Sequence, residues 1–238
     1  AQEYRSQELN REAAIARLQR TLTIRDFLDN NDRAGATRRY LQGDASPRKY
    51  EIIDSAHGVE ILMNAPAMPY DPPLRNGKSY RQRAHIAENI QAFVAIDDLL
   101  AKNGLRVPQM RAVDIDAGLL ILEHLGLEGI RAPSGEPVVE RYEAAGRFLA
   151  HLHRVQWPDH APVAGYPDHI IAPFDRDAMI MEVSLVGQWY APRMMGRKLS
   201  DAEVQAYEGA WDKVLDAIAD CEKSLLLRGD HSPNLFWV

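Results

Sequence analysis

The segment that decides the fold is Leu225-Leu226-Leu227-Arg228-Gly229-Asp230-His231-Ser232-Pro233-Asn234-Leu235-Phe236-Trp237-Val238. An apolar run leads into a short polar loop that contains Asp, His, Ser and Asn, and a second apolar run follows the loop. This pattern predicts a strand, a loop and a strand. Because active-site loops are often held between rigid elements, Asp230, His231 and Asn234 are the first candidates for chemistry. The alternative is a solvated turn between two core strands.

Length and composition limit the classes of protein to consider. The chain has 238 residues, of which 46% are hydrophobic and 26% are charged, with a net charge of -6. This length allows two small cores, and we expect two lobes. The negative charge disfavours binding to nucleic acid or to an anionic membrane, so a nucleotide would need a local basic site. The single cysteine, Cys221, excludes a disulfide framework and a multi-thiolate metal site, which suits the cytoplasm.

The first half of the chain is predicted to form a helix followed by an α+β lobe. Residues 1–30 are expected to be a helical linker, and residues 31–125 to be the first lobe. Strands are predicted at 37–41, 49–54, 59–64, 107–114 and 118–123, and a helix at 86–100 that ends at Asn103-Gly104. Five antiparallel strands with one inserted helix form an α+β lobe. The linker helix has apolar residues at helical spacing, namely Ile15, Leu18, Leu22, Phe27 and Leu28.

A glycine-containing loop between the first two predicted strands is a candidate phosphate-binding site. Loops of Gly and small residues expose backbone amides that can close over phosphates, and a basic side chain adds charge. The same composition is also typical of an ordinary turn. The candidates for nucleotide binding here are Gly43, Asp44, Ala45, Ser46, Arg48 and Lys49.

The second half, residues 126–238, is predicted to be mostly helical. We expect helices at 142–152 and 179–190, a loop at 162–173, and a long helix opened by the capping box Ser200-Asp201-Ala202-Glu203. His153 is expected to be a buried structural histidine. In the first half, Glu60 and Glu88 could each be an acidic partner for a base of the first lobe, although a solvated carboxylate is the expected state of either. The predicted buried face of the long helix holds Val204, Tyr207, Trp211, Val214, Leu215 and Ile218.

Several motifs occur in one order along the chain and together resemble the aminoglycoside phosphotransferase superfamily over residues 25–238. Within it, the likeness extends to the bacterial N-acetylmuramate/N-acetylglucosamine anomeric kinases. It also extends to the phosphotransferase domain that some alphaproteobacteria fuse to the ATPase subunit of the tRNA threonylcarbamoyladenosine system. This branch usually has Asp where this chain has Asn64. The motifs are Gly43-Asp44-Ala45-Ser46, Ile61-Leu62-Met63-Asn64-Ala65-Pro66, Leu119-Leu120-Ile121-Leu122-Glu123-His124-Leu125-Gly126, Leu149-Ala150-His151-Leu152-His153 and His231-Ser232-Pro233-Asn234-Leu235.

The resemblance implies a bilobal protein-kinase-like fold with ATP and Mg²⁺ as cofactors. ATP would lie beneath the loop at residues 43–46, and the backbone of Leu122, Glu123, His124 and Leu125 would hold the adenine. Asp230 and His231 would be catalytic, and Asn234 would bind Mg²⁺. The implied acceptor is a sugar or amino-sugar hydroxyl.

Two positions depart from the family pattern. The family's catalytic Asp lies five positions before the Asn, where this chain has Gly229, so Asp230 is one residue too close. One residue of extended chain spans about 3.3 Å and reverses the side-chain direction. Met63 stands where a protein kinase would carry its phosphate-binding Lys.

These departures keep other functions open. One alternative is a nucleotide-binding pseudokinase that regulates a fused or partner tRNA-modification ATPase, and another is an aminoglycoside kinase. A hydrolase is disfavoured because the sequence has no Gly-x-Ser-x-Gly elbow. The family's second metal ligand follows the Asn loop by more residues than this sequence contains, so we expect the second lobe to be C-terminally incomplete.

Overall fold

The computed structural model describes residues 2–43, 48–68, 77, 79–221 and 234–238, and the chain divides into two compact units. The first unit contains residues 1–68, 89–127 and 238, and the second contains residues 69–88 and 128–237. The first is built on a sheet, and most of the second is helical. The predicted α+β kinase-like class is confirmed by this division of secondary structure.

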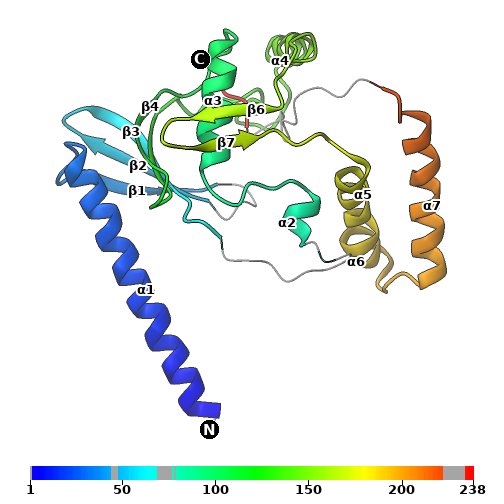
Figure 1. The fold of residues 1–238 in the computed structure, drawn as a ribbon, viewed down its shortest axis with the longest axis horizontal. Coiled ribbons are helices and arrows are strands. Elements are labelled where there is room, and N and C mark those ends of the chain that lie inside the picture. Colours follow the sequence, from blue (N-terminus) through cyan, green and yellow to red (C-terminus); the bar gives the residue numbers. More distant parts are fainter. Residues whose placement is uncertain (1, 44–47, 69–76, 78, 222–233) are drawn as a thin grey trace. The chain divides into compact units, whose positions relative to one another are not determined.

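A five-stranded antiparallel sheet forms the centre of the first unit (Figure 1). Its strand order is β1-β2-β3-β5-β4. The predicted strands are confirmed, except that the fourth begins at Met110 rather than at 107. Pro108 has no N–H to donate to a strand ladder, which explains the later start. The strands are β1 (Thr37–Leu41), β2 (Lys49–Ser55), β3 (Gly58–Asn64), β4 (Met110–Asp114) and β5 (Leu119–Glu123).

Both faces of the sheet are covered because β5 is apolar on both sides. Successive side chains of a strand point to opposite faces, and residues 119–122 of β5 are all buried. On one face, Leu119 and Ile121 pack with α1 (Gln2–Asn30). On the other face, Leu120 and Leu122 pack with Met63 and with residues of and beside α3 (Gln91–Lys102). The inserted helix at 86–100 is thus confirmed, with a shift of a few residues.

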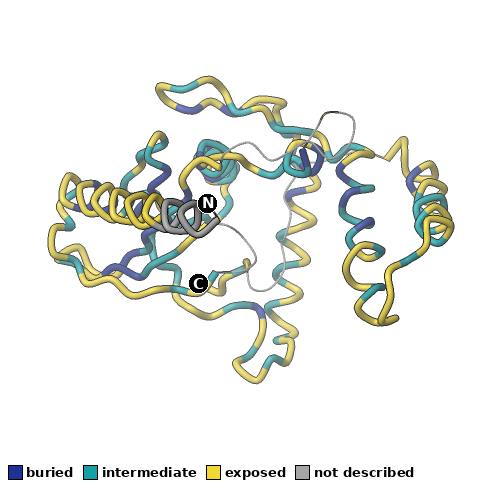
Figure 2. The backbone as a smooth tube through the Cα atoms, turned by 90° about the horizontal axis from the view of Figure 1, so that it is seen from below, coloured by how far each residue is buried: buried dark blue, intermediate teal, exposed yellow. Residues whose placement is uncertain are grey.

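Only the C-terminal part of α1 packs on the sheet. Its buried residues are Ile24, Phe27 and Leu28, which are 4%, 6% and 4% exposed. Ile15 and Leu18 are 45% and 61% exposed, so the apolar residues of this stretch do not form a buried face within the described chain. Figure 2 colours most of the described residues of this helix as exposed. The helix therefore belongs to the core of the first unit through its last two turns.

The second unit contains helices and one hairpin. The hairpin was predicted as a loop, because Pro162 and Pro167 obscured the strand pattern. Gly165, at φ 79°, closes the turn between its strands. His153 is exposed at the end of α4, so the prediction of a buried histidine was wrong. The elements are α2 (Tyr80–Arg83), α4 (Val139–Leu152), β6 (His160–Val163), β7 (Tyr166–Ile170), α5 (Arg176–Leu185), the π-helix Val186–Tyr190, α6 (Ala191–Met195) and α7 (Asp201–Ala217).

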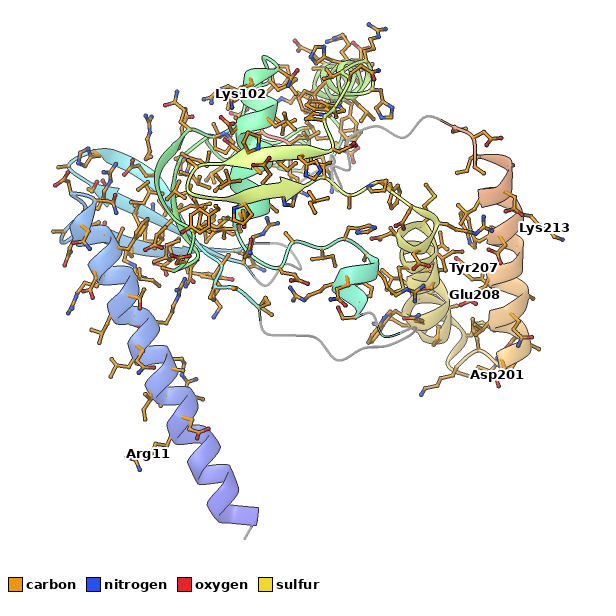
Figure 3. The ribbon with its side chains drawn as sticks, viewed as in Figure 1. Arg11, Lys102, Asp201, Tyr207, Glu208 and Lys213 are labelled. Carbon is orange, nitrogen blue, oxygen red and sulfur yellow. The ribbon has the colours of Figure 1, made fainter. Side chains whose placement is uncertain are left out.

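Helix α7 begins with the predicted capping box, in which Ser200 and Glu203 bond each other's backbone N–H groups. Its predicted buried face is only partly correct. Leu215 is buried, whereas Val214 is 49% exposed. The Tyr207 hydroxyl donates a hydrogen bond of 3.0 Å to the Val183 carbonyl of α5, and Figure 3 shows Lys213 pointing away from that side. Among the helices that the structure describes, none has the length and apolar character that crossing a membrane requires.

Candidate functional site

The Tyr50 ring lies against the base of the β1–β2 loop. A Cβ atom at Gly43 would lie 3.3 Å from the Cδ2 atom of Tyr50, so the glycine backbone lies close to that ring. Tyr50 in turn packs against the core cluster on the α3 face. Arg48 and Lys49 are exposed where the loop enters β2. The predicted residues 44–46 lie outside the described residues, so the loop's role in phosphate binding stays a prediction.

Asn64 at the end of β3 is held by an arginine from α1. Its Oδ1 accepts hydrogen bonds from Arg20 Nε at 3.0 Å and from Arg20 Nη2 at 2.7 Å. The same guanidinium donates to the carbonyls of Ala117 and Gly118 in the β4–β5 turn. Partial burial lowers the pKa of Arg20. Nothing in the local sequence indicates this contact, because Arg20 lies 44 residues before Asn64.

The charges on β3 are arranged differently from those of a protein kinase. Met63 stands where a protein kinase would carry its Lys, and its side chain is fully buried on the α3 face. Glu60 lies three residues earlier and therefore on the opposite face. It is 5% exposed and accepts two hydrogen bonds from Arg33, of 3.0 and 2.8 Å. The prediction of a solvated carboxylate was wrong for Glu60, whereas Glu88 is exposed as expected.

The predicted adenine-binding segment follows the end of β5. The Glu123 carboxylate receives two hydrogen bonds from Arg106, of 2.9 and 2.6 Å, and one of 3.1 Å from the Gln109 N–H. The bonds from Arg106 contribute most to lowering the pKa of Glu123. This side chain is therefore engaged within the first unit. His124 and Leu125 follow β5 and belong to no strand, so their backbone groups are not part of a sheet ladder.

The second unit contains the predicted metal ligand. Asn234 is exposed, while Gly229, Asp230 and His231 lie outside the described residues. Two residues after Asn234, Phe236 forms an antiparallel bridge with Gly129, and the Trp237 N–H donates to the Glu128 carbonyl at 2.8 Å. The predicted second strand is thus a single bridge in the structure.

The Asn234 side chain carries an oxygen of the kind that Mg²⁺ prefers. Magnesium prefers oxygen ligands, often one or two from the protein with the rest from water and phosphate. The Asn234 amide supplies such an oxygen. Within the described parts of the chain, no group of three or more His, Cys, Asp or Glu side chains could hold a metal ion. Asn234 therefore remains a predicted ligand that would share the ion with phosphate oxygens.

Comparison with known proteins identifies relatives with named activities. The chain is 28% identical over 197 residues to an N-acetylmuramate/N-acetylglucosamine kinase of Pseudomonas putida, an alignment that covers 80% of this chain and 48% of the relative. It is 27% identical over 228 residues to the protein of the same name in Caulobacter vibrioides, covering 89% of this chain and 61% of the relative. The chain thus spans about half to three-fifths of the length of these relatives.

The model of the phosphotransferase enzyme family matches residues 37–238, from β1 to the last residue. This range includes the β1–β2 loop, the segment after β5 and the loop that carries Asn234. The predicted resemblance to the aminoglycoside phosphotransferase superfamily and to the anomeric sugar kinases is confirmed. By this match, which covers far more than half of the sequence, the chain belongs to the phosphotransferase enzyme family.

Proposed function

We propose that the chain is an ATP-dependent phosphotransferase that acts on a sugar or amino-sugar hydroxyl. The observation that carries the proposal is the similarity to kinases named for N-acetylmuramate and N-acetylglucosamine over 80–89% of this chain. The similarity extends beyond one motif, because the family match begins at β1 and reaches the last residue. The acceptor is accordingly proposed to be an amino sugar of the cell-wall type.

The proposal assigns a role to each part of the site. The loop at residues 43–46, with Arg48 and Lys49, would bind the phosphates, and the backbone of residues 123–125 would hold the adenine. Asp230 and His231 would bind and orient the acceptor hydroxyl, and Asn234 would bind Mg²⁺. When bound, Mg²⁺ would neutralise charge on the phosphate oxygens. A general base contributes about 10²- to 10⁴-fold to such a reaction, so an Asp230 displaced by one residue would slow turnover without abolishing it.

The test is phosphate transfer by the purified chain. It is incubated with ATP and Mg²⁺ and with N-acetylmuramate, N-acetylglucosamine or an aminoglycoside, and the phosphorylated product is detected by phosphorus NMR. Transfer to either amino sugar supports the proposal, and transfer to the aminoglycoside alone would favour an antibiotic kinase. Lys49→Ala is expected to raise the KM for ATP by about tenfold if Lys49 contacts phosphate. Lys102→Ala is the matched control, since Lys102 lies on α3 and pairs with Asp98.

Two features favour a second candidate, a pseudokinase that binds nucleotide without transferring phosphate. Gly229 replaces the expected catalytic Asp, and Met63 is buried where a kinase Lys would stand. In that case ATP would stabilise the chain, by about 2.7 kcal/mol at 100 times its dissociation constant, but no sugar would be phosphorylated. Gly229→Asp would then create activity by restoring the spacing to Asn234. In this second proposal the pseudokinase would regulate a fused or partner tRNA-modification ATPase. We also propose a cytoplasmic location, where ATP is available.

A further inference from the structure

Arg141, in the first turn of α4, joins two segments of the second unit that are far apart in sequence. Its Nη1 donates to the Gly129 carbonyl at 2.7 Å, and its Nη2 bonds the Glu128 carboxylate at 2.6 Å. The guanidinium carbon also lies 5.4 Å from the centre of the Trp237 ring, within the range of a cation–π contact. We call Glu128, Gly129, Arg141 and Trp237 the Arg141 clamp.

The clamp acts on a backbone pairing that would otherwise be very short. Gly129 forms one antiparallel bridge with Phe236, and the Trp237 N–H donates to the Glu128 carbonyl. A Cβ atom at Gly129 would lie 3.4 Å from the Leu235 carbonyl oxygen, which shows how closely the two backbones approach. An isolated bridge contributes little stability by itself. Arg141 adds two charge-assisted hydrogen bonds and a ring contact to three residues of this pairing, Glu128, Gly129 and Trp237.

Asn234 lies only two residues before this bridge. Successive Cα atoms are about 3.8 Å apart, so the Asn234 backbone is within about 7.6 Å of the bridge at Phe236. The side chain of Arg141 is only 20% exposed, so the ion pair with Glu128 is partly shielded from solvent. Fixing residues 235–237 therefore restricts where the Asn234 amide can lie.

We infer that Arg141 is a positioning residue, which holds the segment after Asn234 so that its amide is placed to bind the divalent cation that accompanies ATP. The inference rests on the proposed function for the role of Asn234. It requires a guanidinium, because Lys presents a point charge and lacks the planar fork that bonds two acceptors while lying over a ring. Arg141→Lys should therefore behave like Arg141→Gln rather than like the native chain.

The first measurement reports on the clamp without needing activity. Selective isotope labelling of the four tryptophans yields a backbone amide signal for Trp237, identified by its absence in Trp237→Phe. In Arg141→Gln and Arg141→Lys this amide should exchange its hydrogen roughly tenfold faster or more. Arg147→Gln is the control, because Arg147 lies on the same helix, is 69% exposed and pairs only with Glu143 at 3.9 Å. Exchange in the control should match the native chain.

The second measurement reports on the metal. In the phosphate-transfer assay, Arg141→Gln should raise the Mg²⁺ concentration for half-maximal rate by about tenfold, as removal of supporting contacts around metal ligands does elsewhere. The KM for the sugar should change by less than about twofold. If Arg141→Gln does not fold, Trp237→Leu removes the ring contact while leaving α4 intact and should raise the same Mg²⁺ requirement.

The failure of this inference is distinguishable from failure of the proposed function. If the native chain transfers no phosphate, the result counts against the proposed function and not against this inference, and the Mg²⁺ requirement is replaced by Mn²⁺ binding in the presence of ATP, followed by electron paramagnetic resonance. Equal Trp237 exchange in the native chain and in Arg141→Gln overturns the inference. Faster exchange with unchanged metal binding also overturns it, because the clamp would then hold the segment without placing Asn234.

Discussion

Replacing Asn64 with Asp is expected to stabilise the first unit, because the residue already accepts two hydrogen bonds from Arg20. The two bonds are already charge-assisted because the donor is a guanidinium, so the substitution adds the attraction of an ion pair in the same geometry. A carboxylate and a guanidinium about 4 Å apart near a protein surface attract by several kcal/mol, and desolvation of the half-buried carboxylate offsets most of this. The net gain of about 1 kcal/mol should raise the melting temperature by about 2–4 °C.

The assay is thermal unfolding followed by far-UV circular dichroism, since α1 and the sheet dominate the signal of this unit. Arg20→Met should cost about 2–3 kcal/mol, because Asn64 Oδ1 and the Ala117 carbonyl lose this donor, whereas the Gly118 carbonyl keeps its bond from the Ala65 N–H. In the variant that combines Arg20→Met with Asn64→Asp, the gain in unfolding free energy from Asn64→Asp should vanish. Arg25→Met is the control, since Arg25 is 61% exposed and pairs with the adjacent Asp26. A melting temperature of Asn64→Asp at or below that of the native chain, or a gain that survives Arg20→Met, would refute the reasoning.

Three further predictions concern the first unit. Gly118→Ala should cost about 2–4 kcal/mol in thermal unfolding, because φ is 65° and the new Cβ would lie 2.4 Å from the Ala65 carbonyl oxygen, too close to be accommodated. Glu60→Gln should cost about 3–5 kcal/mol in urea unfolding, since it leaves the buried Arg33 guanidinium without its counter-charge. Burial raises the pKa of Asp97 from 3.8 to about 6, so the folded state favours the neutral acid and loses stability as pH rises through that range. Asp97→Asn should therefore be more stable than the native chain at about pH 8, by about 1–2 kcal/mol, with the difference vanishing near pH 4 in urea titrations.

The sheet was predictable because its signals are local. Period-two runs located β1, β2 and β3 to within a residue, and a turn glycine at Gly118 preceded β5. The β6–β7 hairpin was missed because its two prolines mimic a loop, although a two-stranded ribbon can place prolines away from its few ladder bonds. Ile15 and Leu18 have the helical spacing that predicted a helix, but they are exposed, so periodicity located the helix without showing which of its residues are buried.

The candidate site was predictable at the level of motifs and not at the level of contacts. The sequence identified Asn64 as a departure from a family pattern and predicted Asn234 as a metal ligand, because short motifs carry these positions. It gave no sign of Arg20 or Arg141, which contact Asn64 and Trp237, 44 and 96 residues away in the chain. Such contacts form only once the backbone has folded, so no local pattern specifies them.

The apolar side chain of Met63, in the place of a kinase Lys, is consistent with the raised pKa of Asp97. In protein kinases a Lys on the third strand forms an ion pair with an acid on the helix that covers the sheet. Here Met63 is buried on the face that α3 covers. Asp97 lies one helical turn after Phe93 and Val94, which pack on that face. It is 8% exposed and has no cation partner among the described residues. A buried acid without a cation favours its neutral form, which agrees with its raised pKa.

Two arginines of the first unit form ion pairs with acids on the sheet rather than with an acid on α3. The buried cation Arg33 is committed to Glu60 on the α1 face, and Arg106 is committed to Glu123. Neither guanidinium is left to neutralise phosphate. If the chain binds ATP, neutralisation of the phosphates would fall to the amides and basic side chains of the nucleotide loop and to the divalent cation. This dependence makes the placement of Asn234, and with it the Arg141 clamp, more important here than in a kinase that keeps its strand lysine.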